Sequence, residues 1–159
     1  MKKIISLVTI TISDQLRSAR ISTTKSKKPV LISTLNTRNL KKQGNLEELN
    51  SNLRKYNISI LGIQEHRFIH TDEPISYQTI EGNYLITTSA WKNAQNEATS
   101  GIGILLSPKS KMSLGEVKKI SHRVMTATFQ GKPATTIIVA YSPTKRTDNE
   151  TKSRNYKTI

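Results

Sequence analysis

The chain has 159 residues, enough for one ordinary domain, and its hydrophobic content of 35% allows only a modest core. It contains no cysteine, which excludes a disulfide framework and a thiolate metal site and fits an intracellular protein, in the nucleus or the cytoplasm. The formal net charge of +14 favours a polyanionic partner.

Most of the excess positive charge lies at the two ends of the chain. Residues 1–29 hold seven Lys or Arg and one Asp, and residues 145–159 hold five basic and two acidic residues. This composition predicts a disordered basic lead-in over residues 1–29, a folded part over 30–144 and a polar basic tail over 145–159. Basic tails add salt-sensitive affinity for nucleic acid without sequence choice; a merely solvating surface is the alternative.

The N-terminal stretch has some features of a secretory signal, because lysines precede a nine-residue run over residues 4–12. Three hydroxyl residues interrupt the run and no small-x-small cleavage site follows before Arg17, so we do not expect a signal peptide. This run and every later apolar run are too short to span a bilayer, so we expect no membrane partner.

A strand–helix–strand unit is predicted over residues 30–64. Residues 30–35 and 58–64 are β-branched, apolar runs typical of strands buried on both faces. A helix with one apolar face is expected between them. Its signals, in chain order, are Asn45 as N-cap, then Leu46, Leu49, Leu53 and Tyr56 on the apolar face, and Asn57 as C-cap.

The connection between these two strands is long enough for a parallel crossover. Parallel strands end at the same edge of a sheet, so Asn36 and Glu65, which follow the two runs, are expected side by side. Ligand sites of open α/β sheets lie at this edge. The alternative is a solvated strand end, in which Glu65 and Arg67 form a weak ion pair.

After Glu65 the pattern changes to short strands joined by turns, which indicates antiparallel or mixed pairing. A polar loop is expected over residues 91–100 and a short helix near residues 150–156. The expected strands are, in chain order, residues 76–80, 84–89, 101–106, 124–129 and 134–141.

Polar groups therefore end three predicted strands, at Asn36, Glu65 and Tyr141. Carboxylate and amide oxygens suit a hard cation such as Mg²⁺, which keeps several waters and can bind next to a phosphate. Tyr141 could donate a hydrogen bond to a phosphate or a developing oxyanion. Its alternative role is that of a strand-end tyrosine with a buried ring and a solvated hydroxyl.

Other chemistry is less well supported by the sequence. His66 and His70 have a spacing that suits zinc on a helix, but here they follow a strand and no third ligand is evident. Gly101 and Gly103 open a strand rather than a helix, so they do not form a dinucleotide site. His122 is expected at the surface.

Four motifs, taken in order and at their spacing, resemble the endonuclease/exonuclease/phosphatase superfamily. The most similar group is the apurinic-endonuclease-like domain of non-long-terminal-repeat retrotransposons, and the resemblance covers roughly residues 30–144. The motifs are Leu-Asn-Thr-Arg-Asn-Leu at residues 35–40, Leu-Gly-Ile-Gln-Glu-His-Arg at 61–67, Gly-Ile-Gly-Ile-Leu-Leu at 101–106 and Val-Ala-Tyr-Ser-Pro-Thr at 139–144.

The resemblance implies a four-layer α/β sandwich, in which two mixed sheets are flanked by helices. It implies hydrolysis of DNA phosphodiesters with Mg²⁺, or Mn²⁺ in its place, which leaves a 3′ hydroxyl for reverse transcription. Glu65, Asn36 and Tyr141 match catalytic positions of the family, the first two as metal-binding residues and Tyr141 on the scissile phosphate. The residues expected to bind substrate beside them are Arg67, Arg38 and His66.

The sequence departs from the family pattern at Arg38, where some members have Asp, and at Val139, where many have Asn. It also lacks the family's Gly-Asp-x-Asn motif and terminal Asp-His pair, which orient water and stabilise the transition state. We therefore expect an N-terminal portion of such a domain, truncated and inactive by itself. The alternative is a non-catalytic, basic nucleic-acid-binding fragment; a phosphatase for lipid or inositol phosphates is disfavoured by the charge.

Overall fold

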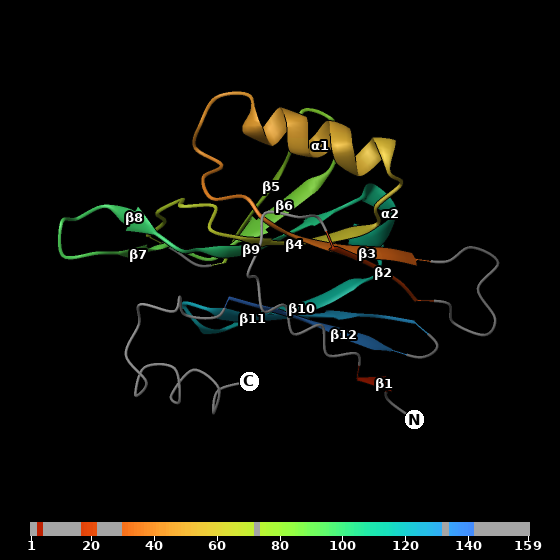
Figure 1. Ribbon diagram of the computed structural model, residues 1–159. Helices are drawn as coiled ribbons and strands as arrows, with labels where there is room; N and C mark the ends of the chain where they lie inside the picture. Colours follow the sequence, from red (N-terminus) through yellow and green to blue (C-terminus); the bar gives the residue numbers. More distant parts are fainter. Residues whose placement is uncertain (1–2, 5–16, 22–29, 72–73, 132–133, 142–159) are drawn as a thin grey trace.

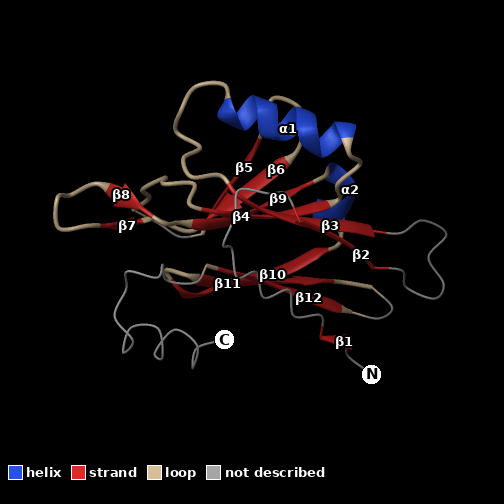
Figure 2. Ribbon diagram, in the orientation of Figure 1, coloured by secondary structure: helices blue, strands red, loops and turns tan. Residues whose placement is uncertain are grey.

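The computed structural model describes residues 3–4, 17–21, 30–71, 74–131 and 134–141. Its class is mixed α/β, as expected, with strands predominating (Figure 2). The elements are β1 (Lys3–Ile4), β2 (Arg17–Ile21), β3 (Val30–Asn36), α1 (Asn45–Lys55), β4 (Ile60–Gln64), β5 (Ile75–Gln78), β6 (Tyr84–Thr87), β7 (Trp91–Lys92), β8 (Ala98–Thr99), β9 (Ile102–Leu106), α2 (Pro108–Met112), β10 (Leu114–Ser121), β11 (Val124–Phe129) and β12 (Thr135–Ala140).

Two sheets lie face to face, and α1 covers the outer side of the larger one (Figure 1). The larger sheet has the strand order β2-β3-β4-β9-β6-β5, and the smaller has the order β1-β12-β11-β10. A two-stranded ribbon, β7–β8, projects from one end of the larger sheet (Figure 1). In the described part of the chain no helix covers the outer face of the smaller sheet, so the layers are helix, sheet and sheet. No helix among the described residues is long and apolar enough to cross a membrane.

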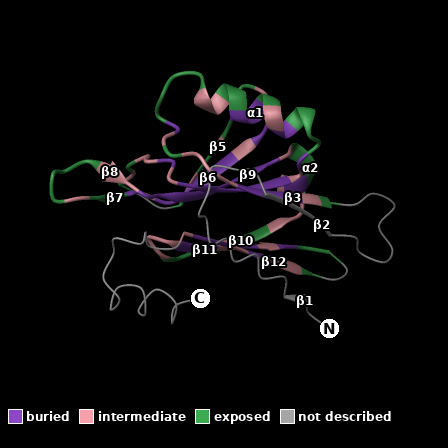
Figure 3. Cartoon of the chain, viewed as in Figure 1, coloured by how far each residue is buried: buried purple, intermediate pink, exposed green. Residues whose placement is uncertain are grey.

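Two apolar clusters hold these layers together (Figure 3). Between the sheets, Ile104 of β9 packs in one cluster with Met125 of β11. Between the larger sheet and α1, Leu53 packs in a second cluster with Leu61 and Leu105. The strands β4 and β9 contribute to both clusters and are buried along their whole length. The prediction of burial on both faces is thus confirmed for β4, whereas β3 is fully buried only over residues 32–34.

The ends of α1 differ by one position from the expected caps. Gly44 is the N-cap, with a left-handed φ of 86°, and Asn45 is the first helical residue. The prediction that Asn45 caps the helix is wrong, because its side chain donates to the Asn39 carbonyl at 2.7 Å. Tyr56 is the C-cap, and Asn57 follows it with φ 53°. Tyr56 is half exposed and lies outside the apolar cluster under the helix.

The parallel pairing of β3 and β4 is confirmed. Ile32 lies opposite Ile60, and Asn36 lies opposite Gln64 at the shared C-terminal end of the two strands. The expected hairpins β5–β6 and β11–β12 are antiparallel, also as predicted.

The lead-in expected to be disordered contributes strands where the structure describes it. Residues 17–21 form β2, which pairs antiparallel with β3, and residues 3–4 form β1, which pairs parallel with β12. The prediction is wrong there because the free edges of β3 and β12 offer backbone donors and acceptors with which another strand can pair. The polar composition of residues 1–29 does not show that such edges are available.

Three further elements were not predicted. The expected polar loop over residues 91–100 contains the ribbon β7–β8, and both α2 and β10 follow β9. β10 is an edge strand of the smaller sheet, and its pairing with β11 has two register shifts. The helix expected near residues 150–156 lies outside the described residues.

A buried polar network ties α1 to the turn between β5 and β6. Asn50 is fully buried, and its Oδ1 atom accepts hydrogen bonds from Thr79 Oγ1 at 3.1 Å and Asn83 Nδ2 at 2.9 Å. Its Nδ2 atom donates to the Leu46 carbonyl at 2.8 Å. Because the two bonds to Oδ1 are buried, Thr79 and Asn83 would each lose the compensation for leaving water if Asn50 were removed.

Candidate functional site

Asn36 and Glu65 lie side by side at the shared end of β3 and β4. The Nδ2 atom of Asn36 donates a hydrogen bond to Oε1 of Glu65 over 2.9 Å, although the two residues are 29 positions apart. Parallel pairing brings them together, because Asn36 is opposite Gln64, the residue before Glu65. The predicted proximity is confirmed, while the chemical roles of the two residues stay predictions.

The orientation of the Asn36 amide follows from its two neighbours. Its Oδ1 atom accepts the backbone N–H of Arg38 at 2.9 Å, and its Nδ2 atom faces Glu65. The reverse orientation would place Oδ1 of Asn36 against the Glu65 carboxylate and Nδ2 against the N–H of Arg38, and both contacts are unfavourable. Asn36 therefore orients the Glu65 carboxylate, and its own Oδ1 atom keeps one lone pair beside the bond from Arg38. The Arg38 side chain is exposed beside this turn.

Backbone hydrogen bonds hold the strand end on both sides of Glu65. Thr37 donates to the Gln64 carbonyl from its amide at 2.9 Å and from its hydroxyl at 3.0 Å. The Arg67 amide donates to the Ser100 carbonyl at 3.1 Å. Glu65 is thus fixed between two anchored neighbours, which limits the directions its carboxylate can take.

Three residues of the site have left-handed backbones: Arg38 with φ 55°, Glu65 with φ 57° and Arg67 with φ 63°. This conformation costs a non-glycine residue on the order of 1 kcal/mol, and the surrounding hydrogen bonds must offset it. Backbone strain of this kind is common at functional sites, where it gives side chains directions that a regular strand does not allow.

Tyr141, just beyond β12, reaches Glu65 from the smaller sheet. Its hydroxyl lies close enough to the Glu65 carboxylate and to Arg123 for both groups to influence its pKa. Burial, followed by the hydrogen bond and the negative charge of Glu65, raises the pKa of Tyr141 to about 12, although Arg123 acts in the opposite direction. The phenol therefore stays protonated at neutral pH and can donate. All three residues predicted to be catalytic lie in one cluster.

Two guanidinium groups border this cluster. The Nη2 atom of Arg67 lies 3.9 Å from Oε2 of Glu65 and its side chain is 40% exposed, so the weak ion pair expected as the alternative is also present. The Nε atom of Arg67 and the Nη1 atom of Arg123 are buried without a hydrogen-bond partner. Unpaired buried N–H groups are costly, and these two atoms have almost no surface open to solvent. The two guanidinium groups thus place positive charge beside the Glu65 carboxylate.

His66 turns inward, away from this cluster. Its ring is fully buried, its Nδ1 atom accepts the Phe68 amide at 2.9 Å, and its Nε2 atom lies 3.2 Å from the Ile102 carbonyl. Gly101, with φ +92°, makes room for the ring, because a Cβ atom there would lie 2.6 Å from Cε1 of His66. The prediction that His66 binds substrate is wrong: both ring nitrogens hold the chain, and no ring surface is exposed.

Arg123, His122 and Trp91 extend the site beyond the predicted residues. The Nε atom of Arg123 donates to Nε2 of His122 at 3.1 Å, and the His122 ring lies against the Trp91 ring with centroids 5.6 Å apart. Burial, Arg123 and Lys119 all lower the pKa of His122, so its Nε2 atom is available as an acceptor. These contacts have no signature in the sequence, because they join a turn to a distant ribbon.

The donor set fits a loosely held Mg²⁺ better than zinc. Within the described residues no three His, Cys, Asp or Glu side chains come together to bind a metal, and the His66 and His70 ring centroids are 6.4 Å apart. Mg²⁺ is commonly bound through one or two carboxylates and keeps several waters, which the single Glu65 carboxylate can support. Zinc requires three or four protein ligands.

No protein-family model matches this sequence, and a comparison with the curated proteins finds no match. The contacts around Glu65 are therefore the basis on which a function can be assigned.

Proposed function

We propose that this chain belongs to a phosphodiester hydrolase that nicks DNA, with Mg²⁺ bound through Glu65, and that it is nearly inactive by itself because it lacks the Gly-Asp-x-Asn and Asp-His motifs. The observation that supports it is the 2.9 Å contact between Asn36 and Glu65 at a sheet edge, in a cluster with Tyr141 and two guanidinium groups. A carboxylate, a neutral hydroxyl donor and cations around one point are what binding and cleavage of a phosphodiester require.

Each side chain has a definite part in this proposal. Bound Mg²⁺ supplies Lewis-acid stabilisation of charge on the phosphate oxygens. Asn36 keeps the carboxylate of Glu65 oriented, and Tyr141, which is protonated at neutral pH, would turn its hydroxyl hydrogen from Glu65 to a phosphate oxygen. The guanidinium groups of Arg67 and Arg123 would supply positive charge to the same phosphate. Hydrolysis joins a water oxygen to phosphorus and breaks the bond to the 3′ oxygen, which leaves as a hydroxyl.

The resemblance to the endonuclease/exonuclease/phosphatase superfamily extends the proposal. In that case the chain would have a four-layer sandwich with helices outside both sheets, and would serve a retrotransposon by nicking DNA in the nucleus or the cytoplasm. The helix–sheet–sheet order and the site at the ends of β3, β4 and β12 are consistent with that arrangement.

A plasmid-nicking assay tests the proposal. Wild type and Glu65→Gln are incubated with supercoiled DNA and Mg²⁺, with EDTA as the metal-removal control. We expect at most trace nicking by wild type, because the chain lacks the motifs that orient water and stabilise the transition state, and we expect EDTA and Glu65→Gln to abolish this trace. Glu116→Gln is a matched control, since Glu116 pairs with Lys118 on β10, away from this strand end. Nicking that survives both Glu65→Gln and EDTA overturns the proposal.

The second candidate is a nucleic-acid-binding protein without catalysis, which the net charge of +14 favours because lysine and arginine side chains can bind phosphate without a metal. It predicts equal binding of DNA by wild type and Glu65→Gln in EDTA, with affinity falling steeply as salt rises. It also predicts no nicking by either protein, which separates it from the first candidate.

A further inference from the structure

We propose that Trp91 is a stacking platform for the base of an unpaired nucleotide whose phosphate lies at the Arg67–Arg123 end of the site. This inference deepens the proposed function, on whose nucleic-acid partner it rests, by naming single-stranded or locally unpaired nucleic acid as the ligand. It assigns a role to the ribbon β7–β8, which the catalytic cluster does not use.

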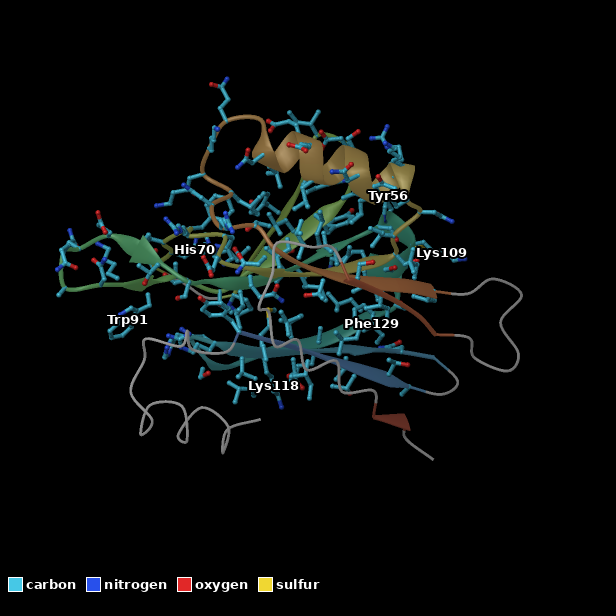
Figure 4. All side chains as sticks on the ribbon, in the orientation of Figure 1. Tyr56, His70, Trp91, Lys109, Lys118 and Phe129 are labelled. Atoms are coloured by element: carbon cyan, nitrogen blue, oxygen red, sulfur yellow. The ribbon has the colours of Figure 1, made fainter. Side chains whose placement is uncertain are left out.

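Trp91 is exposed in a way that suits an external ligand. It lies on β7, in the ribbon that projects beyond the larger sheet, and 59% of it is exposed to solvent (Figure 4). Its contact with His122 is tilted, at 39° between the ring planes, and leaves more than half of Trp91 exposed to a ligand. A large exposed indole is costly in water and marks a binding surface when polar and charged groups surround it.

A continuous series of contacts joins this indole to the candidate site. Trp91 lies against His122, the His122 Nε2 atom accepts from Arg123, and the Arg123 guanidinium lies over the Tyr141 ring, 5.1 Å from its centroid. Tyr141 in turn interacts with Glu65. A base on Trp91 and its neighbouring phosphate at Arg123 would therefore be positioned by adjacent side chains.

The charge around Trp91 fits a nucleic-acid strand. Lys92 follows it in β7, and Lys119 is close enough to His122 to lower the pKa of that imidazole. The acidic group of this ribbon, Glu97, is held by the Asn93 side chain at 3.0 Å and by the Asn93 turn. Single-stranded nucleic acids are bound by this combination of cations along the backbone and aromatic rings under the bases, whereas paired bases offer no free face.

The test uses Trp91 as its own probe, since it is the single tryptophan of the chain. The whole protein is titrated in EDTA with a short oligothymidylate and with an abasic oligomer that has the same number of phosphates. We expect oligothymidylate to quench the tryptophan fluorescence and to bind about tenfold more tightly than the abasic oligomer. Equal affinities with unchanged fluorescence overturn the inference.

Variants separate stacking from general affinity, with binding followed by anisotropy of labelled oligomers. Trp91→Leu is expected to lose the preference for bases, and Trp91→Phe to keep most of it. Tyr56→Leu is the matched control, because Tyr56 is also half exposed beside a lysine, Lys55, but lies at the opposite end of the molecule (Figure 4). Loss of the preference in Tyr56→Leu, or its retention in Trp91→Leu, contradicts the inference.

The outcome is independent of the nicking assay. If Glu65→Gln leaves nicking unchanged while Trp91→Leu loses the base preference, the proposed hydrolase is wrong and the stacking platform stands. If both oligomers bind equally while duplex DNA is nicked in a Glu65-dependent way, the platform is wrong and the hydrolase stands.

Discussion

The guanidinium of Arg123 lies over the phenol ring of Tyr141, with its Cζ atom 5.1 Å from the ring centroid. Arg123 comes from the turn between β10 and β11, and its carbonyl also accepts the Tyr141 amide at 2.9 Å. The smaller sheet thereby brings a cation and a hydroxyl donor to the Glu65 carboxylate of the larger sheet. The candidate site belongs to both sheets.

The Tyr141 phenol should ionise only in strong alkali. Its pKa is raised from 10.0 to about 12, so the folded state keeps this proton where the unfolded chain loses it. The stabilisation from this group is therefore full below pH 10 and is lost as the pH rises from 10 to about 12. Tyrosinate absorbance against pH, wild type minus Tyr141→Phe, should show a midpoint near 12. A difference titration centred on the ordinary value would contradict this.

Asn36→Ala should destabilise the protein and loosen Glu65. It removes a hydrogen bond to a carboxylate, which we expect to cost about 1–2 kcal/mol because the pair is partly buried. Asn39→Ala is the control: its Oδ1 accepts the Lys41 amide just as Asn36 accepts that of Arg38, without a bond to Glu65. Urea denaturation gives both free energies of unfolding, and equal losses would mean that the contact with Glu65 contributes nothing.

Gly101→Ala should be strongly destabilising. The new Cβ atom would lie 2.6 Å from the His66 ring at a φ of +92°, so backbone strain and overpacking together should cost about 3 kcal/mol or more. Gly44→Ala isolates the backbone cost, about 1–2 kcal/mol, because φ is +86° there and nothing lies within 4 Å. Thermal and urea unfolding of the two variants measure the difference; similar losses would show that the His66 ring can move aside.

Asn50→Ala should weaken the docking of α1. It leaves the Thr79 hydroxyl and the Asn83 amide without their buried acceptor, at a cost of about 2–4 kcal/mol. Asn52→Ala, on the same helix and outside this network, should change stability by less than about 0.5 kcal/mol. Hydrogen exchange should show faster opening of α1 in Asn50→Ala alone, and equal protection in both variants would be inconsistent with the network holding the helix.

The parallel strand–helix–strand unit and the pairing of Asn36 with Glu65 could be predicted because both follow from patterns in a short segment of the sequence. Two uninterrupted apolar runs separated by a helical repeat allow few topologies, and the polar residue after each run then falls at one edge. The α1 caps were misplaced by one position because Asn45 bonds to the Asn39 carbonyl, which no propensity of Asn45 indicates.

The rest of the site could not be predicted in this way. Arg123 and Trp91 reach it through contacts between distant segments, and a lone basic or aromatic residue near a turn has no signature of its own. His66 is next to Glu65 in the sequence, but its side chain is buried on the opposite side of the strand end. Its adjacency to Glu65 therefore led to the wrong prediction that it binds substrate. The sequence shows that residue 101 is a glycine, but the reason that a glycine is needed there depends on the position of the His66 ring.

The strand β10 also bears on how this protein behaves at high concentration. It is an edge strand of the smaller sheet, its pairing slips twice against β11, and it carries Lys118 and Lys119. An irregular, lysine-bearing border is a poor template for another chain to extend. Neighbouring molecules should therefore fail to join sheets along this side, which protects a modestly hydrophobic, highly basic protein from fibril growth.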